Sequence, residues 1–193
     1  MSTDIGTPEG PYSVWRRVAA SGAGGKVLAV LFFLGAAISL VGLADMADVG
    51  MAGSAIALVA AAVQAGLLCV VARLSLPAGA VTRDEIIWMV LWGAFGATGL
   101  AGVLNGLGPG AVIAPFAEEL IKLAAVIAVL VIGVRTPLRG LALGFTAGAG
   151  FEVFENLQYA ISPDDGGLGV AQELTTIASR MLVGFGFHAF TVA

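Results

Sequence analysis

Charged residues are scarce in this sequence. Only 11% of its 193 residues are charged and 59% are hydrophobic, whereas about a quarter of the residues in a typical soluble domain are charged. The mean hydropathy of +0.99 is correspondingly high. This composition excludes an ordinary water-soluble domain and predicts that lipid surrounds most of the chain.

Cysteine and histidine are rarer still, since each occurs once, as Cys69 and His188. A single cysteine excludes an intramolecular disulfide and a paired-cysteine motif, and a single histidine excludes the HExxH zinc motif. Nine basic residues stand against thirteen acids and form no dense cluster. We therefore do not expect a nucleic-acid partner.

Long apolar runs, in contrast, are abundant. A helix needs about 20 apolar residues to cross a bilayer, and a chain in lipid must satisfy its backbone polar groups internally. We therefore predict an all-α, polytopic transmembrane bundle of about six helices, over residues 27–44, 51–72, 86–104, 111–134, 140–161 and 177–193. Residues 1–26 are predicted to form a cytoplasmic N-terminal segment, and residues 27–193 a single transmembrane domain.

The charges between these runs alternate from one side to the other. The connections predicted on one side hold the bases Arg16, Arg17, Lys26, Arg73, Arg83, Arg135 and Arg139. Those on the other side hold Asp45, Asp48, Asp164, Asp165 and Glu173 with no lysine or arginine. Because basic connections stay in the cytoplasm, we predict a cytoplasmic N-terminus and a multi-pass protein of the inner (cytoplasmic) membrane.

Ionisable groups inside the apolar runs are confined to the last three. A charge at mid-bilayer costs about 2.5–3.5 kcal/mol on the lowest scale, so each such group needs a partner, a water cavity or a function. The groups, with one amide among them, are Glu118, Glu119, Lys122, Glu152, Glu155, Asn156, Arg180 and His188. Counted at about 1.5 Å per residue, Glu118, Glu155 and His188 are expected in one layer in the outer half of the bilayer.

Helical spacing leaves several pairings open. Lys122 can meet either Glu118, four residues before it, or Glu119, three residues before it. Glu152 can take part in the chemistry or pair with Arg180 on the next helix. Asn156 and His188 can likewise serve the reaction or simply hold helices together.

The order of these motifs matches a known family. Glu-Glu-x-x-Lys over 118–122, Phe-x-x-x-Glu-Asn over 151–156 and a later intramembrane Arg180 and His188 resemble the PrsW family of membrane proteases. The resemblance runs from about Pro115 to His188. This family is related to the CAAX prenyl endopeptidases and the bacterial Abi proteins, which have a histidine where this sequence has Glu155.

The resemblance implies an intramembrane endopeptidase that cuts a membrane-anchored protein, as in the regulated cleavage of anti-sigma factors. Peptide hydrolysis needs an activated water, charge stabilisation and protonation of the leaving amine. We expect Glu118 or Glu119 as the general base, Glu155 orienting the water, and His188 stabilising the oxyanion or protonating the amine. The expected supporting residues are Lys122, Glu152, Asn156 and Arg180.

The sequence leaves the cofactor open, and it also leaves open two functions other than a protease. Zinc or another divalent metal could be held by Glu119, Glu155 and His188, since carboxylates and imidazole are ordinary zinc ligands. An ion- or proton-coupled transporter would also carry intramembrane charges, although no inverted repeat is visible. A catalytically inactive scaffolding relative would keep every motif. Proteins of this kind usually continue for one or two more helices, which leaves a C-terminal truncation open.

Overall fold

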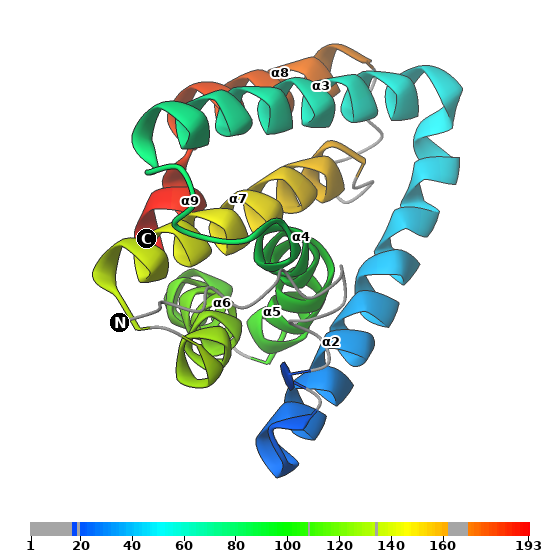
Figure 1. Cartoon of the computed structure of the whole chain (residues 1–193). Coiled ribbons are helices and arrows are strands. Elements are labelled where there is room, and N and C mark those ends of the chain that lie inside the picture. Colours follow the sequence, from blue (N-terminus) through cyan, green and yellow to red (C-terminus); the bar gives the residue numbers. More distant parts are fainter. Residues whose placement is uncertain (1–16, 19, 108, 134, 162–169) are drawn as a thin grey trace, which may run out of the picture.

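The computed structural model describes residues 17–18, 20–107, 109–133, 135–161 and 170–193, and the regular elements within these ranges are all helical (Figure 1). This confirms the all-α prediction. Two short non-α segments, η1 (Leu43–Asp45, 3-10) and η2 (Trp92–Ala97, π), join neighbouring helices. The α-helices are α2 (Ala23–Gly42), α3 (Met46–Ser75), α4 (Arg83–Leu91), α5 (Thr98–Asn105), α6 (Gly110–Ile132), α7 (Pro137–Ile161), α8 (Val170–Val183) and α9 (Phe187–Thr191). Most of the predicted N-terminal segment (residues 1–16) and the acids Asp164 and Asp165 lie outside the described residues.

Three stretches in the described part of the chain are long and apolar enough to cross a membrane. They are Ala23–Gly42, Gly50–Ser75 and Arg83–Asn105, and they correspond to the first three predicted runs. The next two helices, α6 and α7, have 23 and 25 residues and therefore sufficient length. They also carry ionisable groups that lower their apolar character.

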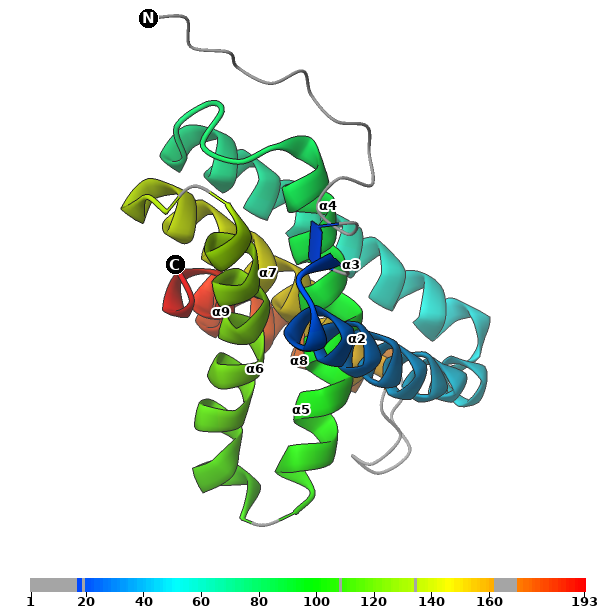
Figure 2. The ribbon, with the colours of Figure 1, turned by 60° about the horizontal axis from the view of Figure 1, so that its bottom comes forward.

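Helix α7 is the central helix of the bundle. It packs against α3, α4, η2, α6, α8 and α9 (Figures 1 and 2). Seven consecutive residues, from Ala142 to Gly148, are buried, so these two turns of α7 are enclosed on all sides, as expected of a helix in the interior of a bundle. Every other helix that contributes an ionisable group to the interior contacts α7.

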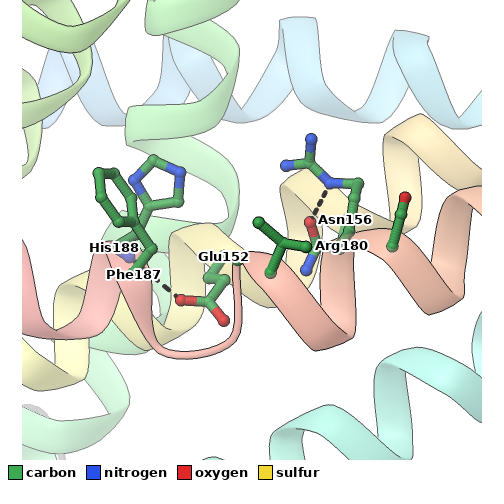
Figure 3. Close-up of a pocket in the computed structure, with 8 residues that line it drawn as sticks. Glu152, Asn156, Arg180, Phe187 and His188 are labelled. Carbon is green, nitrogen blue, oxygen red and sulfur yellow. Dashed lines mark hydrogen bonds between the residues drawn. The ribbon is translucent and has the colours of Figure 1, made fainter.

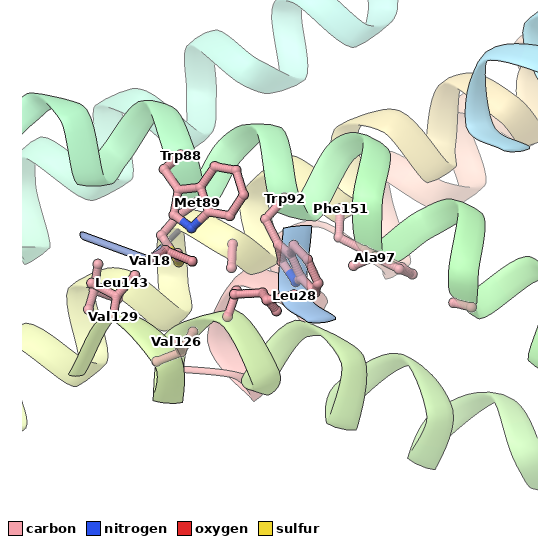
Figure 4. Packing of buried hydrophobic residues seen from close by; sticks show 13 residues of the cluster. Val18, Leu28, Trp88, Met89, Trp92, Ala97, Val126, Val129, Leu143 and Phe151 are labelled. Atoms are coloured by element: carbon pink, nitrogen blue, oxygen red, sulfur yellow. The ribbon is translucent and has the colours of Figure 1, made fainter. Parts of the chain in front are cut away.

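A cluster of large side chains fixes α4, η2, α6 and α7 to one another (Figure 4). Trp92 and Met89 are fully buried, and Phe151 is 1% exposed. The Trp92 indole Nε1 donates a hydrogen bond to the carbonyl oxygen of Ile121 at 3.0 Å, as buried indole groups usually require. This bond fixes the backbone of α6 directly before Lys122.

The π-helical segment η2 was not predicted from the sequence. Side chains add hydrogen bonds to two carbonyl groups that the backbone N–H of Thr98 also contacts. Thr98 Oγ1 donates to the carbonyl oxygen of Gly93 at 2.9 Å, and Ser39 Oγ donates to that of Phe95 at 2.8 Å. A Cβ at Gly93 would collide with the carbonyl oxygen of Ala147. The glycine therefore permits direct backbone packing between η2 and α7, and π segments of this kind are frequent near functional sites.

The last apolar run differs from the prediction. A continuous helix was expected over residues 177–193, but α8 ends at Val183 and α9 begins at Phe187. Gly186 between them has φ = 75°, a left-handed conformation that glycine adopts without steric cost. The chain therefore turns at Gly184–Gly186 and presents His188 on a separate short helix.

Two basic connections lie at the same end of the bundle. Thr82 and Glu85 form a capping box at the start of α4, and the second oxygen of the Glu85 carboxylate forms an ion pair with Arg139 at the start of α7. The connection from α3 to α4 and that from α6 to α7 are thereby held together, in agreement with the predicted alternation of sides. That this end faces the cytoplasm stays a prediction.

Candidate active site

Lys122 lies fully buried in the middle of the polar cluster. Its Nζ is 2.5 Å from Oε1 of Glu119 and 2.7 Å from Nδ1 of His188, and it also lies 4.3 Å from the centroid of the Phe151 ring. A buried ammonium group is tolerated only when such partners compensate its lost hydration. Of the two acids that helical spacing allowed, Glu119 is the one that pairs with Lys122.

The neighbouring Glu118 points to a different partner. It is 8% exposed, and its Oε1 accepts a hydrogen bond from Nδ2 of Asn105, at the end of α5, at 3.1 Å. Its Oε2 lies 4.0 Å from Nε2 of His188. Two consecutive glutamates on α6 therefore approach His188 with different partners: Lys122 holds Glu119, and the amide of Asn105 holds Glu118.

The imidazole ring of His188 connects the acids of α6 with Glu155 of α7. Its Nδ1 lies 3.5 Å from Oε1 of Glu119, and its Nε2 lies 3.3 Å from Oε2 of Glu155. Nζ of Lys122 lies 2.7 Å from the same Nδ1, and an ammonium group can only donate, so Nδ1 is the acceptor of that hydrogen bond and Nε2 is the nitrogen that faces Glu118 and Glu155. The imidazole is thus held by a lysine at one nitrogen and approached by two carboxylates at the other.

Arg180 of α8 fixes Glu155 from the other side. Its Nη2 lies 2.5 Å from Oε2 of Glu155, and its Nε donates to Oδ1 of Asn156. The guanidinium group also lies 4.0 Å from the centroid of the Tyr159 ring. Arg180 thus pairs with Glu155 and not with Glu152, which the spacing had left open.

Glu152 holds the start of α9 in place (Figure 3). Its Oε1 accepts from the backbone N–H of Gly186 at 2.7 Å, and its Oε2 accepts from the backbone N–H of His188 at 3.2 Å. The carboxylate is 1% exposed, and Gln64 of α3 donates to it at 2.8 Å. Because the first N–H groups of a helix have no partner inside that helix, Glu152 satisfies two of them and fixes the backbone that carries His188.

Two neutral amides complete the network. Gln64 accepts a hydrogen bond from Nδ2 of Asn156 at 3.0 Å while it donates to Glu152, so the amide of Asn156 is directed away from His188. Asn105 was not singled out in the sequence, although it is a polar residue at the end of an apolar helix. Gln64 is 1% exposed and joins two α7 side chains.

A pocket of about 420 Å³ opens beside these groups, between α7 and the α8–α9 turn (Figure 3). The polar lining comes from Glu152, Asn156, Ser179, Arg180 and His188, and Phe187 contributes an apolar wall. The size falls in the range of small-molecule and peptide-side-chain sites, about 300–1,000 Å³. The imidazole of His188 is therefore accessible from this pocket.

Glu118, Glu155 and His188 together could hold a metal ion. One ligand atom from each lies within 4.8 Å of the other two, and tetrahedral zinc ligands at about 2.0 Å from the metal are about 3.3 Å apart. The pair formed by His188 and Glu155 already has this separation, at 3.3 Å. The set differs from the one expected from the sequence, because Glu118 stands in it where Glu119 was expected.

The comparison with known proteins gives one family. Residues 82–193 match the sequence model of the family described as PrsW family intramembrane metalloprotease. The match begins well before Pro115, where the resemblance in the sequence was placed, and covers more than half of the chain. No curated protein and no solved structure gives a significant match.

Proposed function

Because the chain belongs to the PrsW family of intramembrane metalloproteases, we propose that it hydrolyses a peptide bond in a membrane-anchored protein at the cluster formed by Glu118, Glu119, Glu155 and His188. The observation that carries the proposal is the convergence of Glu118, Glu155 and His188 within 4.8 Å beside the pocket. Membership of the family favours a membrane protease over the transporter that intramembrane charges alone would also allow.

The three converging groups are the proposed metal ligands. Two carboxylate oxygens and one imidazole nitrogen suit zinc or another divalent cation, and three protein ligands are the usual number at a catalytic zinc site. A cation there would supply Lewis acidity toward the scissile carbonyl group. Arg180 holds the Glu155 carboxylate and Asn105 holds that of Glu118, so both are oriented before a cation binds.

Glu119 is the proposed general base. Its Oε1 is held by Lys122, while its Oε2 is buried and has no hydrogen-bond partner among the described residues. An unused acceptor at this position suits removal of a proton from the attacking water. As the new C–O bond forms and the C–N bond breaks, the same carboxyl group returns that proton to the leaving amine.

Lys122 and Glu152 support these groups without touching the substrate. Lys122 balances the charge of Glu119 and lies against the Nδ1 side of His188. Glu152 keeps the backbone of α9 against α7. With the N-terminus in the cytoplasm of an inner membrane, cleavage would take place in the outer half of the bilayer, where the sequence placed the ionisable layer. Regulated cleavage of an anti-sigma-factor-like protein is the proposed biological setting.

The test uses the full chain, purified in detergent and reconstituted with a panel of tagged single-span membrane proteins. Cleavage is followed for the wild type and for Glu119→Gln and His188→Ala. Loss of one general base lowers rates by about 10²–10⁴-fold. Glu85→Gln is the matched control, because Glu85 is also a buried acid in an ion pair but lies away from the pocket. Equal cleavage by the wild type and both site variants would refute the protease proposal. The alternative of a catalytically inactive scaffolding protein would then remain.

A further inference from the structure

A second pocket lies between α3, α4 and α7 and has a volume of about 660 Å³. The connection over residues 76–81 lines one end of it. None of Glu118, Glu155 and His188 contributes to its lining. It is therefore separate from the pocket of the candidate active site.

The lining of this pocket is apolar except at one place. Leu68, Val90, Phe145 and Val153 are typical of its walls, and Arg73 is the charged residue among the lining residues. The hydroxyl group of Thr146, also in the lining, is already bonded to the carbonyl oxygen of Ala142 at 2.6 Å. The pocket thus offers an apolar interior and a single cation.

Arg73 is available for a ligand. Its side chain is exposed, and within the described part of the chain no carboxylate forms an ion pair with it. It is in the last turn of α3, at the end of the bundle where Glu85 and Arg139 join the two basic connections. Arginine binds phosphate oxygens through two parallel hydrogen bonds.

The volume of the pocket suits a thin, flexible ligand better than a helical peptide. A helix with side chains is about 10 Å across, so that 660 Å³ would hold only about 8 Å of it, fewer than two turns. A flexible acyl chain fills a narrow apolar volume without that limit. In a protein that crosses a membrane, phospholipid is the abundant molecule that combines an acyl chain with a phosphate.

We propose that this pocket binds an anionic phospholipid, with one acyl chain between α3, α4 and α7 and the headgroup phosphate on Arg73. Basic pockets between transmembrane helices on the cytoplasmic side recognise anionic headgroups. Each arginine near the surface contributes about 1 kcal/mol to that attraction, which corresponds to about a fivefold preference for an anionic over a zwitterionic lipid.

Lipid binding is measured by native mass spectrometry of the full chain in detergent, titrated with phosphatidylglycerol or phosphatidylcholine. Arg73→Gln removes the proposed phosphate ligand, and Ala149→Phe fills the pocket from α7. The matched controls are Arg135→Gln, an exposed arginine outside the pocket, and Ala124→Phe, an exposed alanine on α6. Thermal unfolding of each variant checks that it is folded, and no protease assay is needed.

The expected result is that the wild type and both controls prefer phosphatidylglycerol about fivefold. Arg73→Gln should abolish the preference while phosphatidylcholine still binds, and Ala149→Phe should weaken both lipids. The proposal is overturned if Arg73→Gln and Arg135→Gln reduce the preference equally, which would indicate a general surface charge. It is also overturned if folded Ala149→Phe retains lipid like the wild type, or if the retained molecule is a peptide.

Discussion

Gly148 of α7 is in direct backbone contact with His188, whose carbonyl oxygen occupies the place where a Cβ on Gly148 would lie. This glycine of α7 therefore lets α9 pack directly against the bundle at the residue that carries the imidazole. Close approach of this kind is the usual reason for small residues between membrane helices. The position of His188 depends on the absence of one methyl group.

Gly148→Ala should move α9 away from α7 and disturb the site. Overpacking of this kind costs about 1–3 kcal/mol, and displacement of His188 should lower kcat by more than that loss of stability explains. Gly102→Ala is the control, because no atom lies within 4 Å of the added Cβ. Thermal unfolding and cleavage rates of the two variants are compared; equal rates would contradict the importance of this contact.

Lys122→Met should destabilise the bundle strongly. The change leaves Glu119 near His188 without its ammonium partner, and breaking a buried ion pair from one side costs about 3–5 kcal/mol. Adding Glu119→Gln should restore part of that stability, because the uncompensated charge is then gone. The free energy of unfolding of the single and double variants tests this, with Lys26→Met, an exposed lysine, as the control.

Metal content separates the roles of the two consecutive glutamates. Glu118→Gln, Glu155→Gln and His188→Ala each remove a proposed ligand and should lower the bound metal about 10-fold or more. Glu119→Gln should keep the metal and lose cleavage, because Glu119 is proposed as the base. Elemental analysis of the purified variants measures the first quantity. Retention of metal by Glu118→Gln together with its loss in Glu119→Gln would instead favour the ligand set expected from the sequence.

Glu152→Ala should impair the reaction through His188 without touching the substrate. It leaves the backbone N–H groups of Gly186 and His188 without their acceptor, at about 1–3 kcal/mol for each buried unsatisfied group. We expect kcat to fall while KM changes little. Gln64→Leu removes a bond to the same carboxylate but leaves both N–H groups satisfied, so its kcat should be much closer to that of the wild type. Similar kcat values for the two variants would refute the positioning role.

The sequence predicted the helices best where apolar length alone decides them. The runs at 27–44, 51–72 and 86–104 correspond to the three stretches that can span a membrane, because lipid imposes helix on any long apolar segment. The prediction of a single helix over residues 177–193 was wrong. The break between α8 and α9 depends on Gly186 adopting φ = 75° and on Glu152 accepting hydrogen bonds from 34 and 36 residues away, and neither is visible in local spacing.

The candidate site was predictable as a set of groups but not as a set of partners. The energetic cost of charges in lipid singled out Glu118, Glu119, Glu155 and His188, and the structure brings them together. Helical spacing could not decide which glutamate meets Lys122, since positions three and four residues apart lie on the same face. Asn105 lies one residue beyond the predicted run over 86–104, so the cost of placing polar groups in lipid did not single it out.

The enclosed position of α7 has a consequence for how the chain enters the membrane. Two glutamates on one helix oppose its transfer from the translocon into lipid unless other helices already shield them. The three stretches that are long and apolar enough to span a membrane precede α7 along the chain and leave the ribosome first. Helices formed by residues 23–105 would therefore already be in the membrane when α6 and α7 are synthesised. The acid-bearing helices α6 and α7 would then insert against them.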